Sequence, residues 1–154
     1  MTPLRFCAAI LAVACGAATA GPTSAAEFLE GTARMKERAY SPAVITEGGR
    51  IVWLAGMGGS TAADGSTIKD FGDQARQALR NIDSTLKRTG GTLADVVTMT
   101  VFIRHESDGD TFVKVRAETF KSGFPASALI TVKDFARPEI LVEIQAIAVL
   151  GERN

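Results

Sequence analysis

The sequence predicts a single α+β domain in which one mixed sheet carries two helices. The expected elements follow the order strand, strand, strand, helix, strand, helix, strand, strand, which mixes hairpins with helical crossovers. The length of 154 residues suits one domain with a substantial core and leaves little room for a second. A hydrophobic fraction of 46% beside 22% charged residues favours an ordinary globular domain over a disordered chain.

The N-terminal segment has the layout of a secretory signal peptide. Arg5 provides a positive charge, and the apolar, alanine-rich stretch after it is too short to cross a bilayer as a helix. Small residues precede two candidate cleavage points, after Ala20 and after Ala26. We therefore expect a signal peptide over 1–26 and a mature domain over 27–154, which is periplasmic or secreted and has no membrane attachment. An N-terminal helix that is retained is the alternative.

The first part of the mature domain is expected to hold three strands. A weak strand pattern covers 31–37, and stronger patterns cover 43–47 and 50–56. Gly48 and Gly49 stand between the two stronger segments and indicate the turn of a β-hairpin.

Two amphipathic helices are expected next. Apolar residues at helical spacing predict a helix near 69–89, which ends where Gly90 begins a pair of glycines. A second helix is expected near 110–121, after a turn, with Asp108 or Asp110 as its N-terminal cap.

The last three strands, over 95–104, 127–133 and 139–149, predict that both faces of the sheet are covered. Apolar residues stand on both faces of the first and the last of these strands, whereas a half-solvated sheet alternates apolar with polar residues. Two helices cover only one face, so a second copy of the chain is the simplest cover for the other, and we expect a homo-oligomer. Glu143 and Gln145 are polar residues on that second face. They are either edge residues in contact with water or a carboxylate site at a subunit boundary.

Few residues suited to metal or nucleophilic chemistry stand in the mature domain. Cys7 and Cys15 precede it, and His105 lies in a polar loop and is the sole histidine. Disulfides, cysteine nucleophiles and metal sites of several cysteines or histidines are therefore excluded. Basic and acidic residues are balanced at 17 each, which argues against nucleic acid as a partner. The glycines at 56–59 precede neither a helix nor a P-loop lysine, so we expect no cofactor.

Three segments resemble the RidA/YjgF family of reactive-intermediate deaminases. They are Gln74-Ala75-Arg76-Gln77 with Asn81 one turn on, the run DVVTMTVF over 95–102, and the run VEIQAIAV over 142–149. The resemblance extends from about residue 40 to residue 150. It implies a chorismate-mutase-like fold, with a six-stranded mixed sheet and two helices on one face. It also implies a homotrimer with a small-molecule cleft at each subunit boundary.

The resemblance assigns functional roles to particular residues. Active members of the family hydrolyse the enamine or imine products of amino-acid dehydratases to 2-oxo acids and ammonia. The glutamate that holds the attacking water corresponds to Glu143, and the tyrosine of the cleft corresponds to Tyr40. The glycine of the family's Ser-Gly-Gln strand end corresponds to Gly56, although Ala55 and Met57 flank it here.

The largest departure from the family concerns its Pro-Ala-Arg-Ser motif. The family arginine pairs with the substrate carboxylate, and its position holds Ser127, or Ala128 if the preceding turn is gapped differently. Neither residue carries a charge, and a charge-assisted bidentate pair is worth about 1.5–3 kcal/mol. Arg116 on the neighbouring predicted helix is either a replacement for this cation or a solvated helix residue.

Two functions follow for the mature domain. The first is an exported homotrimer that binds, and in a divergent form hydrolyses, a small metabolite in its clefts, with Glu143 orienting water and Tyr40 lining the wall. The missing cation argues against imino-acid deamination and favours a neutral or apolar ligand. The alternative is an active deaminase of the 2-iminobutanoate/2-iminopropanoate type, a cofactor-free hydrolase in which Arg116 supplies the cation. The sequence leaves open whether the protein is an enzyme.

Overall fold

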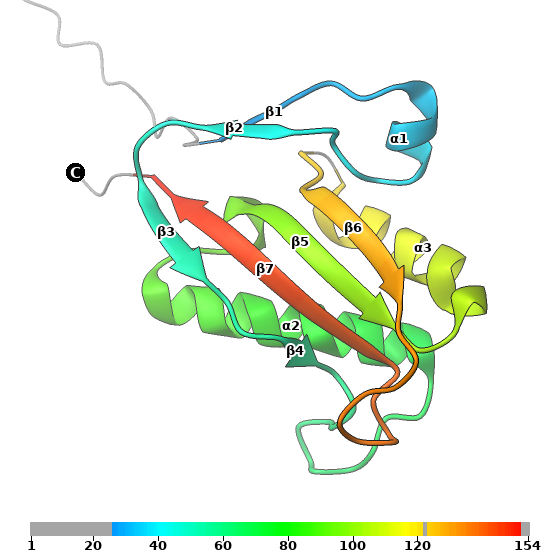
Figure 1. Ribbon diagram of the computed structural model, residues 1–154. Helices are drawn as coiled ribbons and strands as arrows, with labels where there is room; N and C mark the ends of the chain where they lie inside the picture. Colours follow the sequence, from blue (N-terminus) through cyan, green and yellow to red (C-terminus); the bar gives the residue numbers. More distant parts are fainter. Residues whose placement is uncertain (1–25, 122, 152–154) are drawn as a thin grey trace, which may run out of the picture.

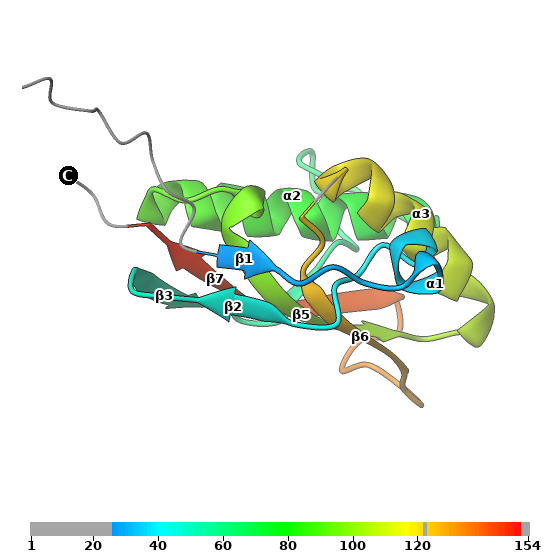
Figure 2. The ribbon, with the colours of Figure 1, turned by 90° about the horizontal axis from the view of Figure 1, so that it is seen from above.

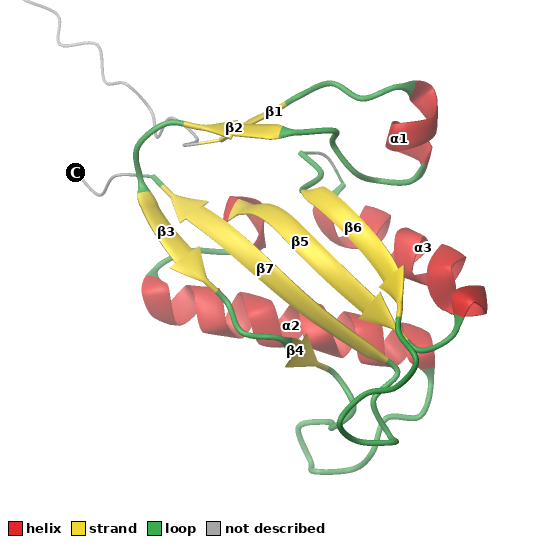
Figure 3. Cartoon of the chain, viewed as in Figure 1, coloured by secondary structure: helices red, strands yellow, loops and turns green. Residues whose placement is uncertain are grey.

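The computed structural model describes residues 26–121 and 123–151. Residues 1–25, with almost all of the expected signal peptide and both cysteines, lie outside the described residues. The described chain is built around a five-stranded mixed sheet, with a smaller two-stranded sheet beside it (Figure 1, Figure 3). The α+β class is confirmed, but the expected six-stranded sheet is replaced by sheets of five and two strands.

The helices and strands have well-defined bounds. The strands are β1 (Ala26–Phe28), β2 (Val44–Thr46), β3 (Arg50–Trp53), β4 (Met57–Gly58), β5 (Val96–Ile103), β6 (Ala126–Thr131) and β7 (Val142–Leu150). The α-helices are α1 (Ala33–Glu37), α2 (Phe71–Thr89) and α3 (Gly109–Phe120), and the short 3-10 helices are η1 (Leu93–Asp95) and η2 (Glu106–Asp108). The large sheet has the order β3-β7-β5-β6, and β4 extends it by pairing with β7. Only β5 and β6 run parallel among these strand pairs.

The strand expected over 31–37 is wrong, because these residues contain the short helix α1. Thr32 caps this helix, since its side-chain oxygen accepts a hydrogen bond from the Met35 backbone N–H at 3.3 Å. The helix buries none of its residues, so its sequence has no apolar stripe that would have predicted it.

The hairpin expected at Gly48 and Gly49 is also wrong. Strand β2 pairs with β1, while β3 pairs with β7, so the two segments belong to different sheets. Both glycines have positive φ angles, of 65° and 79°. A side chain at Gly49 would begin 2.5 Å from the Leu150 carbonyl oxygen. The turn therefore passes close against the end of β7 and delivers β3 to that strand instead of back to β2.

The two long helices lie together on one face of the large sheet, as Figure 2 shows. Asp70 caps α2 by accepting a hydrogen bond from the Asp73 N–H at 2.9 Å, and Gly90 ends it in the left-handed conformation. The N-cap residue of α3 is Asp108, one of the two expected, but neither acid provides a capping hydrogen bond from its side chain. Asp108 has helical backbone angles, which leave its side chain without a capping hydrogen bond, and Asp110 forms an ion pair with Arg38 instead.

The core lies between these helices and the large sheet. Its buried members come mainly from α2, β5 and β7; they include Ala75, Ala78, Leu79, Ile82, Leu86, Met99, Val101, Ile103, Phe112, Val115, Val142, Ile144, Ala146 and Ala148. No helix among the described residues covers the opposite face, which we call the open face. Exposed apolar side chains stand there, with Ile51 at 57%, Trp53 at 75% and Ile130 at 43% of full exposure. The expected pattern of apolar residues on both faces is therefore confirmed.

Candidate functional site

The five residues singled out in the sequence form two groups on opposite faces of the sheet. Ser127 pairs with Met99, which is 2% exposed beneath the helices, so Ser127 faces the helical layer. Glu143 pairs with Phe102, three residues further along β5, so it faces the open side. One chain therefore does not bring the two groups together.

Gly56 and Glu143 form the first group. A side chain at position 56 would begin 2.3 Å from Glu143 Oε1, so the carboxylate occupies the space above the glycine. The carboxylate is half-buried, and no hydrogen-bond or ion-pair partner contacts it among the described residues. It is thus free to accept a hydrogen bond from a water molecule or a ligand.

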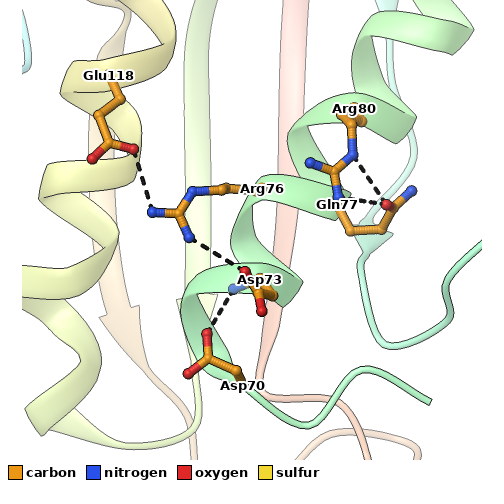
Figure 4. Close-up of polar contacts among 6 residues, drawn as sticks. All are labelled: Asp70, Asp73, Arg76, Gln77, Arg80 and Glu118. Carbon is orange, nitrogen blue, oxygen red and sulfur yellow. Dashed lines mark hydrogen bonds and ion pairs between the residues drawn. The ribbon is translucent and has the colours of Figure 1, made fainter.

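A chain of hydrogen bonds from α2 holds the strand next to Glu143. Gly58 in β4 is the partner of Glu143 in the sheet, and its carbonyl oxygen accepts from Asn81 Nδ2 at 2.9 Å. Gln77 Nε2 donates to Asn81 Oδ1 at 2.8 Å, and Arg80 donates to Gln77 Oε1 from two nitrogens at 3.0 and 2.7 Å (Figure 4). Two residues of the Gln74–Asn81 motif, Gln77 and Asn81, therefore hold β4 in position.

Gln74 supports the other side of the Glu143 strand. Its side chain is fully buried, and Nε2 donates to the carbonyl oxygens of Ile68 at 2.7 Å and Glu139 at 2.8 Å. Its Oε1 accepts from the Leu141 N–H at 2.9 Å. The amide therefore ties the loop before α2 to the entry of β7. This role of Gln74 is not among those expected from the sequence, although a glutamine on the apolar face of a helix indicates a buried polar contact.

Arg76, in the same motif, lies outside the site. Its guanidinium spans from Asp73 on its own helix to Glu118 on α3, at 3.4 Å to each carboxylate, as Figure 4 shows. All three side chains are largely exposed, so the contacts add little to the free energy of unfolding.

Arg116 and Ser127 form the core of the second group. Arg116 is only 3% exposed, which excludes the interpretation of a solvated helix arginine. Its Nη1 donates to Ser127 Oγ at 2.5 Å, and its Nη2 donates to the Arg38 carbonyl oxygen at 2.6 Å. The guanidinium also lies over the Phe112 ring, 5.3 Å from its centre.

Tyr40 joins this second group through the backbone. Ser41 forms a parallel bridge to Ala126, and its N–H donates to the Pro125 carbonyl at 3.4 Å, so this segment runs along the start of β6.

Burial and the charge of Arg38 lower the pKa of Arg116 to about 10, and the nearby Tyr40 opposes that shift. Arg116 thus stays charged at neutral pH.

Two hollows lie near these groups. One, of about 260 Å³, lies on the open face; its lining includes Trp53, Thr98, Thr100, Gln145 and Ile147. Gln145, which lines this hollow, is two residues after Glu143 in β7 and therefore lies on the same face of the sheet. A shallower one, of about 610 Å³, lies where α3 begins and includes Arg38 and Asp110. Within residues 26–121 and 123–151, no three acidic, histidine or cysteine side chains cluster as metal ligands would. No helix in that part of the chain is both long and apolar enough to cross a bilayer.

This α+β fold places the chain in a class of proteins with known relatives. Residues 31–150 match the family model described as Endoribonuclease L-PSP. The chain is 31% identical over 113 residues to the 2-iminobutanoate/2-iminopropanoate deaminase of Homo sapiens, covering 73% of this chain and 80% of that protein. It is 34% identical over 110 residues to a RutC family protein of Pyrococcus horikoshii, covering 71% and 85%.

Solved structures agree with these matches. A conserved Rid family protein of unknown function from Yersinia pestis is similar with a TM-score of 0.72 and 26% identity, over 82% of this chain and 99% of that one. A member of the YjgF/YER057c/UK114 family from Mycobacterium tuberculosis is similar with a TM-score of 0.60 and 30% identity, over 81% and 99%. The chain belongs to the RidA/YjgF/L-PSP family.

Proposed function

We propose that this protein is an exported homotrimer. Its inter-subunit clefts bind a small metabolite that is an imine and hydrolyse its C=N bond. The observation that carries the proposal is the carboxylate of Glu143 standing over Gly56, where a side chain at 56 would begin 2.3 Å from Oε1. A carboxylate without a partner among the described residues, next to a position that has no side chain, is suited to orient water.

The arrangement of the two groups supports an oligomer. Glu143 faces the open side, and Arg116 with Ser127 faces the helical side, so Glu143 can meet such a group only on another copy of the chain. The exposed Trp53 and Ile130 on the open face supply apolar surface for such a contact.

The proposed reaction needs no cofactor. Glu143 accepts a proton from water as the water oxygen adds to the carbon of the C=N bond, and it passes that proton to the nitrogen, which gives a carbinolamine. Glu143 then accepts the proton of the new hydroxyl group and passes it to the nitrogen as the C–N bond breaks. The nitrogen leaves as ammonia, and the carbon keeps the oxygen as a carbonyl group. Relatives named 2-iminobutanoate/2-iminopropanoate deaminase support this reaction class, and the buried cation of Arg116 beside Ser127 supports a substrate that carries a carboxylate.

The second candidate is a metabolite-binding protein without turnover. It is favoured by the burial of Arg116, because a guanidinium that is 3% exposed cannot form the direct bidentate pair with a carboxylate that would fix an imine against the attacking water. Such a protein binds the ligand without accelerating its hydrolysis.

The two candidates are separated by a trapping experiment. A threonine dehydratase generates 2-iminobutanoate in solution, and semicarbazide traps what remains of it with and without the purified protein. We expect the wild-type protein to lower the trapped amount and Glu143→Gln to lose that effect. An unchanged amount at high wild-type concentration would overturn the hydrolase and leave the binding protein.

A further inference from the structure

Arg116 is a buried cation without an acidic partner among the described residues. None of the ion pairs there includes it, and its Nε has no hydrogen-bond acceptor. Buried charges in proteins are ordinarily paired, because removing a charge from water is costly. The Phe112 ring and two hydrogen bonds offset only part of that cost. The position is therefore suited to an anion that this part of the chain does not supply.

The Ser127 hydroxyl contacts Arg116 and keeps some of its hydrogen-bonding capacity. A guanidinium only donates, so Ser127 Oγ is the acceptor of the bond from Nη1. The hydroxyl keeps one proton of its own, and no acceptor for it exists among the described residues. Ser127 is half-buried, so this proton is within reach of a ligand.

We infer that Ser127 and Arg116 form a two-layer anion site, in which the serine hydroxyl contacts a ligand carboxylate and the arginine supplies the charge from behind. Arg116 is then a specificity-determining and positioning residue, because its two bonded nitrogens are taken by Ser127 and Arg38. The inference rests on the proposed function in taking that carboxylate to be the substrate's.

The charge of the surroundings selects a monoanion. The second cation near the site, Arg38, already has Asp110 as its ion-pair partner, which leaves one net positive charge from Arg116. A small monocarboxylate balances that charge, whereas a phosphate dianion would leave an excess.

The two-layer arrangement sets the expected size of the preference for a carboxylate over its neutral amide. A direct bidentate pair between arginine and carboxylate is worth roughly ten- to a hundredfold in affinity. A single hydroxyl that a buried cation polarises donates one hydrogen bond, so we expect a preference of about three- to tenfold for a carboxylate over its neutral amide.

The test compares 2-oxobutanoate with 2-oxobutanamide, which are of similar size and differ in charge. Dissociation constants are measured by calorimetry or ligand-observed NMR at low salt. The wild-type protein is expected to prefer the carboxylate, and Ser127→Ala and Arg116→Met each to lose most of that preference. Because the two residues act as a unit, the double variant should lose no more than either single one, and Arg116→Lys should regain part.

Glu143→Gln separates this inference from the proposed function. It should abolish any turnover and leave the carboxylate preference at least as large as in the wild-type protein, since it removes a negative charge and keeps the positive one. A wild-type protein without the preference, or losses that add up in the double variant, would overturn the two-layer site. Ser127→Ala removes one hydroxyl and keeps the fold, so the result does not depend on whether Arg116→Met is stable.

Discussion

At the scale of single residues, position 56 has no room for a side chain. The nearest obstacle to a methyl group there is the far end of the Glu143 side chain, 2.3 Å away, and not the backbone. A flexible side chain can move aside at low cost in stability, but its carboxylate then leaves the place where it holds water.

Gly56→Ala is therefore expected to separate activity from stability. We expect the free energy of unfolding to change by at most about 1 kcal/mol, and imine hydrolysis to fall at least about tenfold. The matched control is Gly58→Ala, where a methyl group meets only the Val142 carbonyl oxygen at 3.7 Å. Thermal unfolding and the trapping assay measure the two effects. Full activity in Gly56→Ala would contradict the assigned role of Glu143.

The charge of Arg116 gives the anion site a pH dependence. Burial lowers the pKa of Arg116 to about 10, so its charge is complete at pH 8 and declines as the pH rises through that value. The preference for 2-oxobutanoate over 2-oxobutanamide should therefore be full at pH 8 and fall between pH 9 and 11. Tyr40→Phe is the control, because it removes the hydroxyl group near Arg116 and leaves the guanidinium in place. Arg38 and Asp110 remain in both proteins. A constant preference across this range would contradict the prediction.

The sequence predicted some of the contacts among these residues, while their functional roles stay predictions. Tyr40, Arg116 and Ser127 do lie together, and Gly56 does lie against Glu143. The burial of Arg116 was ambiguous, since it follows Phe112 by one helical turn but stands between exposed Lys114 and Glu118. The spacing of apolar residues along a helix does not show whether an arginine is buried against a serine or exposed to water.

At the scale of elements, α2 and the strand beside it approach each other unusually closely. A side chain at Gly59 would begin 1.9 Å from the Gln74 carbonyl oxygen and 2.7 Å from the Ala78 nitrogen. Both are backbone atoms of a long helix, so neither can move alone. The contact fixes the depth at which α2 lies under β4, and hence the position of the strand that pairs with Glu143.

Gly59→Ala should consequently destabilise the whole fold. We expect a loss of about 3 kcal/mol or more in the free energy of unfolding, because the helix must shift to admit one methyl group. Gly58→Ala is again the matched control, and urea unfolding followed by circular dichroism measures both. Equal midpoints for the two variants would show that the helix is not held at this point.

The elements that were predicted correctly are those with a buried apolar pattern. Helices α2 and α3 and strands β5, β6 and β7 lie near their expected positions, since each places apolar residues in the core at its own period. The errors concern α1 and the β2–β3 connection. The helix buries none of its residues, and the turn that contains Gly49 passes against distant Leu150, a contact that no local pattern shows.

At the scale of the whole molecule, the open face is the part of the structure least consistent with a monomer. Ile51, Trp53 and Ile130 expose large apolar side chains on it, whereas the helical face is closed over a dense core. Apolar surface of this kind on one side of a sheet ordinarily marks an interface. The site residues on the two faces become neighbours only if this surface meets another copy.

The single tryptophan makes this prediction measurable. Light scattering should give about three times the monomer mass, and Trp53 should emit at a shorter wavelength than a solvent-exposed tryptophan because the interface removes it from water. Trp53→Glu places a charge in that interface, so we expect it to lower the mass and to reduce activity with the monomer still folded. Ser84→Glu adds the same charge on exposed α2 surface and should change neither. A wild-type monomer that still hydrolyses 2-iminobutanoate would show that one chain suffices and would refute the shared cleft.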